Sequence, residues 1–138
     1  MEVTNKSIST DAFQWVKRQP QIDGSLMTAR GTGRILDSCG RLANIDDVGV
    51  IVRNFQWMFN SECPYKLPSE VFNFTICETK FQIVQVDHER ISASSKNRQK
   101  HIIVENMCWG LVIILFSAPN QFGSTSRMID LWAREHRG

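Results

Sequence analysis

The chain has 138 residues, of which 42% are hydrophobic and 22% are charged, and its formal net charge is +2. This length fits one domain with its own core, and the composition excludes a disordered chain and a histone-like polycation. Four widely spaced cysteines without a CxxC pair disfavour a structural zinc site. Because the start "MEVTNKSIST" lacks a signal-peptide pattern, we expect an intracellular, cytoplasmic protein that is not secreted and whose free thiols are buried.

The N-terminal half predicts a loose arm, a helix, a strand and a second helix. Residues 1–8 are polar and are expected to form a flexible arm, followed by a short helix in "STDAFQWVKRQP" that Pro20 terminates. "GSLMTARGTGRIL" at residues 24–36 predicts a strand with a bulge or tight turn. A longer helix is expected at about residues 45–60, where apolar side chains recur at spacings of three and four. These side chains are Val48, Ile51, Val52, Phe55, Met58 and Phe59.

The C-terminal half predicts mainly strands. Residues 72–77 alternate between apolar and polar, which is typical of a half-buried strand, and residues 80–86 continue extended structure. The polar stretch 87–100 is interpreted as a loop or the tip of a long hairpin. One or two further strands are expected from residue 101 onward, and a helix at about residues 125–136.

The most apolar run of the chain, residues 107–118, predicts an interior strand. It is shorter than the roughly 18 apolar residues that a membrane-spanning helix needs, so no transmembrane segment is expected. Its residues include Val112, Ile113, Ile114 and Phe116, which favour strands, and turn residues bound the run. The run therefore indicates a strand covered on both faces. The predicted fold is a single α+β domain over residues 9–138, with a mainly antiparallel sheet.

No pattern in the sequence indicates catalysis. His88, His101 and His136 do not form a metal-binding or catalytic motif, and we expect them to be solvated. "RGTGR" at residues 30–34 could hold a phosphate on its backbone amides, but a bulged strand or turn is the alternative. We therefore expect no enzyme, no catalytic residue, no metal ligand, no cofactor and no small-molecule substrate.

The candidate functional residues are basic and aromatic. The basic residues could form one surface that contacts nucleic acid or acidic lipid, and the alternative is a solvated hairpin tip. These residues are Arg30, Arg34, Arg90, Lys96, Arg98 and Lys100. Trp57 lies off the apolar face of the predicted helix and is a candidate interface residue.

The segment "DVGVIVRNFQWMF", Asp47 to Phe59, resembles a helix in the matrix proteins of vesiculovirus-like rhabdoviruses. The resemblance implies a viral structural protein that self-associates beneath a membrane and condenses a ribonucleoprotein. We therefore expect a non-enzymatic, matrix-like protein that forms homo-oligomers and contacts acidic lipid or ribonucleoprotein, peripherally at a membrane. The alternative is an RNA-binding module, such as a viral suppressor of host defence.

Overall fold

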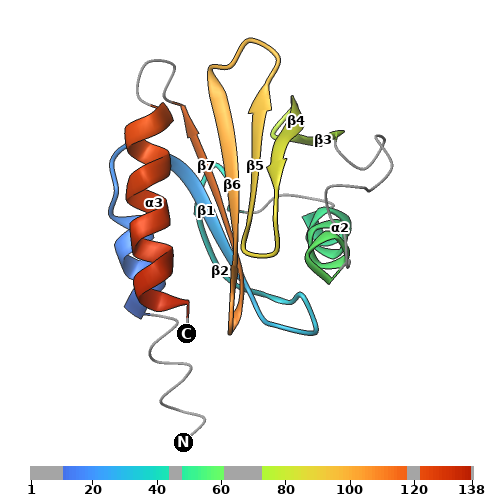
Figure 1. Cartoon of the computed structure of the whole chain (residues 1–138), viewed down its shortest axis with the longest axis vertical. Coiled ribbons are helices and arrows are strands. Elements are labelled where there is room, and N and C mark those ends of the chain that lie inside the picture. Colours follow the sequence, from blue (N-terminus) through green and yellow to red (C-terminus); the bar gives the residue numbers. More distant parts are fainter. Residues whose placement is uncertain (1–10, 44–47, 61–72, 118–121, 138) are drawn as a thin grey trace, which may run out of the picture.

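The computed structural model describes residues 11–43, 48–60, 73–117 and 122–137. These residues form one α+β domain around a seven-stranded antiparallel sheet, so the predicted fold class is confirmed (Figure 1). The strand order is β2-β1-β7-β6-β5-β4-β3. The strands are β1 (Ile22–Thr28), β2 (Ile35–Gly40), β3 (Asn73–Ile76), β4 (Thr79–Val86), β5 (Arg90–Ser95), β6 (Lys100–Met107) and β7 (Gly110–Ser117). The helical segments are residues 11–17, α2 (Val48–Asn60) and α3 (Phe122–His136).

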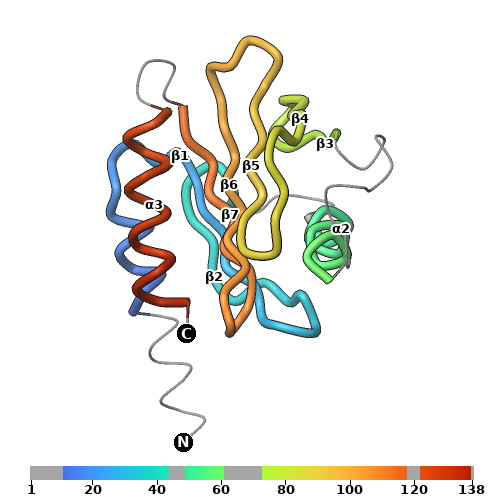
Figure 2. Tube along the Cα trace, viewed as in Figure 1, coloured from blue at the N-terminus to red at the C-terminus, as the bar shows by residue number. Residues whose placement is uncertain are grey.

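The helices cover the two faces of the sheet and create two hydrophobic cores. The N-terminal helical segment (residues 11–17) and α3 lie on one face, while α2 lies on the other (Figures 1 and 2). The first core contains Phe13 and Trp132, and the second contains Phe55 and Phe81. The apolar face of α2 therefore packs as its three- and four-residue periodicity predicts.

Strand β7 separates the two cores and is covered on both faces. Val112, Ile114 and Phe116 belong to the core under α3, whereas Ile113 and Leu115 belong to the core under α2. Burial of each such side chain stabilises the fold by roughly 1.5–3 kcal/mol relative to exposure. The prediction of an interior strand in this apolar run is confirmed.

The turn between β1 and β2 occupies residues 29–34, as "RGTGR" indicated. Gly31 and Gly33 have φ values of 87° and 70°, a left-handed conformation that glycine adopts without a steric penalty. The register of β1 against β2 also shifts between Met27 and Thr28. The predicted combination of a strand with a bulge or turn is therefore confirmed, and the second strand of this hairpin is an addition.

The interpretation of residues 87–100 as a loop is wrong in its central part. Residues Arg90–Ser95 form β5, which pairs with β4 on one side and with β6 on the other. Its serine-rich sequence carries no strand periodicity. The small side chains of Ser92 and Ala93 nevertheless fit between the covering layers and are buried. Only the hairpin tip between β5 and β6 matches the prediction.

The sequence-based expectations for the cysteines and the arm have mixed outcomes. Cys39 and Cys77 are half-buried free thiols, but Cys108 is exposed, because it lies in the turn between β6 and β7. Its predicted burial is wrong. Cys63 and the predicted arm at residues 1–8 lie outside the described residues. Among the described helices, none is long and apolar enough to cross a membrane.

Candidate functional site

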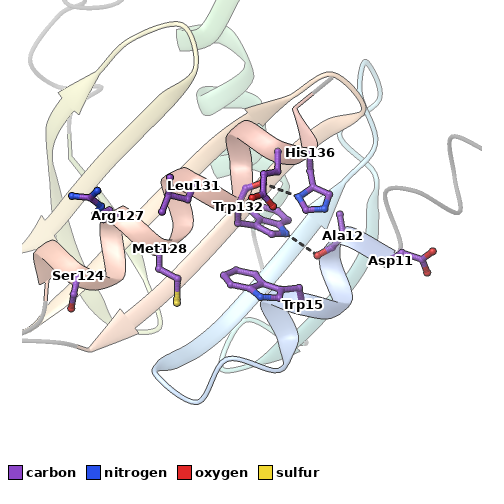
Figure 3. Close-up of a pocket in the computed structure, with 10 residues that line it drawn as sticks. Asp11, Ala12, Trp15, Ser124, Arg127, Met128, Leu131, Trp132 and His136 are labelled. Carbon is purple, nitrogen blue, oxygen red and sulfur yellow. Dashed lines mark hydrogen bonds between the residues drawn. The ribbon is translucent and has the colours of Figure 1, made fainter.

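A wide aromatic groove runs between the N-terminal helical segment and α3 (Figure 3). It encloses about 690 Å³ and is open to solvent along its length. Charged side chains from both helices, Asp11, Arg127 and Glu135, line it together with the aromatic residues. The remaining lining residues are Ala12, Trp15, Ser124, Met128, Leu131, Trp132 and His136.

Two parallel indole rings form the centre of the groove. The rings of Trp15 and Trp132 stack with centroids 5.8 Å apart and an interplanar angle of 9°. Trp132 is nearly fully buried, and its Nε1 donates a 3.1 Å hydrogen bond to the carbonyl oxygen of Ala12. This bond joins two helices whose residues are 120 positions apart in the chain. The ring stack and this hydrogen bond therefore hold the two helices together at the groove.

The end of α3 extends the aromatic surface. The imidazole of His136 lies 5.6 Å from the Trp132 ring, and its Nδ1 is 2.8 Å from the Trp132 carbonyl oxygen, to which it donates when protonated (Figure 3). Leu131 projects into solvent beside these rings, with half of its surface exposed. An exposed leucine next to stacked aromatic rings is typical of a surface that binds a partner.

A second candidate surface is the part of the sheet that none of the described helices covers. On the side of α3, the exposed residues of β3 and β4 alternate with residues buried under α2. We call this surface the open sheet face. It consists of Asn73, Thr75, Lys80, Gln82 and Val84. Val84 is 60% exposed, which is the largest exposure among the large hydrophobic side chains that the structure describes.

A buried ionic cluster anchors the end of the chain beside the groove. Arg90 on β5 and Arg137 after α3 both bind the carboxylate of Glu105 on β6, whose side chain is 1% exposed. Arg90 also donates to the Ser126 hydroxyl and carbonyl oxygens in α3. Burial raises the pKa of Glu105, while the two guanidinium groups oppose this shift. The cluster therefore fixes α3 against the sheet.

His101 is buried, so its predicted solvation is wrong. Its ring lies 4.5 Å from the Phe122 ring and 5.3 Å from the Phe116 ring, at the start of α3. Its Nδ1 is 2.9 Å from the Ser94 hydroxyl, and its Nε2 lacks a hydrogen-bond partner among the described residues. Burial lowers the pKa of His101, which favours the neutral ring. The sequence offered no sign of this burial, because the neighbouring Ser94 belongs to β5, a strand that the sequence analysis did not predict.

Comparisons with known proteins find similar structures but no similar sequences. The sequence matches no protein-family model, and no curated protein matches it significantly. Two solved complexes with rabbit actin match the structure. The chain shares its fold with profilins. LokiProfilin1 in complex with rabbit actin has a TM-score of 0.64 and 14% identity, over 98% of this chain and 95% of that chain.

Two further profilin structures agree with this match. LokiProfilin2 in complex with rabbit actin has a TM-score of 0.63 and 13% identity, over 94% of this chain and 92% of that chain. LokiProfilin1 alone has a TM-score of 0.61 and 12% identity, over 98% and 96% of the two chains. The resemblance to rhabdovirus matrix proteins is therefore wrong, because a short amphipathic helix can occur in unrelated folds. The expected matrix-like and RNA-binding functions are also wrong, because the matching structures are profilins in complex with actin. The same finding contradicts the expected partners, which were further copies of the chain, acidic lipid and ribonucleoprotein.

In this profilin fold, the predicted basic residues do not form one surface. The turn with Arg30 and Arg34 lies at the opposite end of the sheet from the hairpin tip with Lys96 and Arg98 (Figure 1). Lys100 begins β6 next to that tip. Arg90 is bound by Glu105. The solvated hairpin tip is thus the simpler interpretation of the three residues around the β5–β6 turn.

The candidate interface residue Trp57 is 52% exposed on α2, and its use in an interface remains a prediction. Sequence reasoning did not find the aromatic groove, because its two indole rings come from opposite ends of the chain. The available signal was the occurrence of Trp15 and Trp132 on separate terminal helices. Only the fold brings these helices together.

Proposed function

We propose that this chain is a non-enzymatic binding protein whose partner is actin. The observation that carries the proposal is the match, over 98% of the chain, to a LokiProfilin1 structure in which the partner is rabbit actin. A second profilin in complex with actin supports it.

The open sheet face is the surface that best suits a protein partner such as actin. A specific interface typically covers about 800 Å² on each partner, so the five side chains of the open sheet face would form part of such an interface. Within it, Val84 offers an apolar side chain two residues along β4 from Gln82, which pairs with Asn73 of β3. Interfaces that dissociate reversibly typically combine apolar and polar side chains in this way.

The test is a titration of monomeric rabbit actin with the fluorescently labelled protein, followed by anisotropy. We expect saturable binding, and we expect Val84→Glu to weaken it at least about tenfold, because a charge would lose its water at the interface. Val50→Glu is the matched control, since Val50 is 51% exposed on α2 and lies away from the open sheet face. Binding weaker than a Kd of about 1 mM would contradict the proposal.

A second candidate function rests on the aromatic groove. Extended proline-rich peptides bind to grooves lined with aromatic rings, because the polyproline helix is already ordered before it binds. The stacked Trp15 and Trp132 rings, with Leu131 and His136 beside them, provide such a groove. We propose that the groove binds a proline-rich segment of a partner protein, independently of the open sheet face.

Calorimetric titration with a decaproline peptide tests this second function. Trp15→Ala and Leu131→Ser are expected to weaken binding by about five- to tenfold, since each removes an apolar contact surface. Trp57→Ala is the control, because Trp57 is an exposed tryptophan on α2 and does not line the groove. Equal binding of a glycine–serine decamer, or equal loss in the control variant, would contradict the function.

A further inference from the structure

A small cavity with both polar and apolar walls lies at the junction of three segments, away from the groove and the open sheet face. It encloses about 180 Å³. Its walls come from the β1–β2 turn, the last turn of α2 and the hairpin that joins β6 to β7. The lining residues are Arg30, Gly31, Gln56, Phe59, Asn60, Asn106, Gly110 and Leu111.

The guanidinium group of Arg30 is held in a fixed orientation at this cavity. Its Nη1 donates to the carbonyl oxygen of Met107 at 2.8 Å and to Oδ1 of Asn106 at 3.5 Å. Asn106 is itself oriented, because its Nδ2 donates to the carbonyl oxygen of His88 at 2.9 Å. Among the described residues, the side-chain hydrogen bonds of Arg30 use one nitrogen, so the remaining donors of the planar group can bind a ligand.

The guanidinium of Arg30 faces no carboxylate among the described residues. Arg90, Arg134 and Arg137 each pair with an acidic side chain, whereas Arg30 forms no ion pair among the residues that the structure describes. The cavity walls likewise carry no acidic side chain in the described part of the chain. A positive charge, fixed and without a counter-ion, therefore faces a cavity of suitable size for a small anion.

The neutral walls determine which anion fits. Amide groups of Gln56, Asn60 and Asn106 can donate hydrogen bonds, and the buried side chains of Phe59 and Leu111 form an apolar floor. One cation matches a singly charged anion better than a phosphate dianion. The planar fork of a guanidinium also matches the two oxygens of a carboxylate. A Cβ added at Gly31 would meet no described atom within 4 Å, so the space beside this glycine is open and a ligand can approach the turn backbone.

We propose that this cavity is a binding site for a carboxylate, supplied by a small organic acid or by an acidic side chain of a bound peptide. The Arg30 guanidinium binds the two oxygens, and the amide side chains surround them. The proposal does not depend on actin binding, since the cavity lies at the other end of the sheet from β3 and β4 (Figure 1). It can therefore fail or succeed separately from the proposed function.

The test is a titration followed by the amide resonances of Gly31 and Gly110 and the Nε–H resonance of Arg30, at constant ionic strength. The probes are acetate, the blocked peptide acetyl-Gly-Glu-Gly-amide and inorganic phosphate, with chloride as the balancing salt. We expect saturable shifts with the two carboxylates and a Kd of about 1–10 mM, because the cavity is open to water. Tighter binding of the peptide than of acetate identifies a protein source, and the reverse order identifies a free organic acid.

Three variants make the test specific. Arg30→Gln is expected to weaken acetate binding at least about fivefold, and Asn60→Asp to do the same by placing a negative charge on the wall without touching the arginine. Arg34→Gln is the matched control from the same turn, because Arg34 does not line the cavity, and it should bind acetate normally. Tighter binding of phosphate than of acetate, shifts that chloride reproduces, or an equal loss in the Arg34 variant would overturn the proposal.

Discussion

Replacement of Glu105 by glutamine tests how the C-terminal end is held against the sheet. The variant keeps the shape of the side chain but removes the charge that Arg90 and Arg137 share. The one amide oxygen that remains cannot accept from both arginines as the two carboxylate oxygens do, and the amide NH2 faces a guanidinium, while Arg90 keeps the Ser126 oxygens as acceptors in a position where 12% of its side chain is exposed. Arg137 retains the carbonyl oxygens of Glu89 and Asn106 at 3.1 Å.

The expected loss of unfolding free energy is about 3 kcal/mol. Removal of one partner from a buried ion pair typically costs 3–5 kcal/mol, because the remaining charge is buried without compensation. The lower end of this range applies here, since Arg137 is partly exposed and keeps its backbone acceptors. For a domain of this size, such a loss lowers the Tm by about 10 °C.

Urea unfolding followed by circular dichroism measures the change, with Glu89→Gln as the matched control. Glu89 binds Arg137 at 3.4 Å, but the Glu89 side chain is 69% exposed. We therefore expect this variant to lose less than about 0.5 kcal/mol of unfolding free energy. A loss for the Glu105 variant that equals the loss for the Glu89 variant would refute the reasoning. It would mean that the Glu105 carboxyl is neutral in the folded protein, as its raised pKa allows at lower pH.

Three further predictions follow from single contacts. Because burial lowers the pKa of His101, the unfolded chain binds a proton first as the pH falls below about 6.5, so stability decreases as the pH falls from about 7 toward about 5.5. His101→Gln should remove this pH dependence in urea titrations, and an unchanged slope would contradict it. Gly110→Ala is expected to cost more than about 3 kcal/mol, since φ is +153° and a Cβ would lie 1.8 Å from the Thr28 carbonyl oxygen. Gly31→Ala, where a Cβ meets nothing within 4 Å, should cost only about 1 kcal/mol for its left-handed φ, and equal melting temperatures would disprove this difference. Trp132→Phe should cost about 2 kcal/mol by removing the hydrogen bond to Ala12, and a calorimetric Tm within 1–2 °C of the parent protein would show that the bond is dispensable.

The sequence by itself determined the elements whose pattern is local. The apolar run of β7 specified a strand covered on both faces, because almost every one of its side chains must avoid water. Alternation in residues 72–77 and the recurring apolar positions of α2 likewise specified one buried face for each element. These patterns also gave the α+β class, since a helix or strand with one apolar face requires a covering layer.

The tertiary structure alone decided where the functional surfaces lie and which polar residues are buried. Strand β5 has no apolar pattern, and its burial follows from its position between β4 and β6. The Trp15 and Trp132 rings meet only because both terminal helices pack on the same face of the sheet. The same holds for Arg30, whose fixed orientation depends on a carbonyl oxygen 77 positions away. Periodicity indicates which face of one helix or strand is buried and which is exposed to water. A site requires the relative positions of several elements, and long-range packing determines those positions.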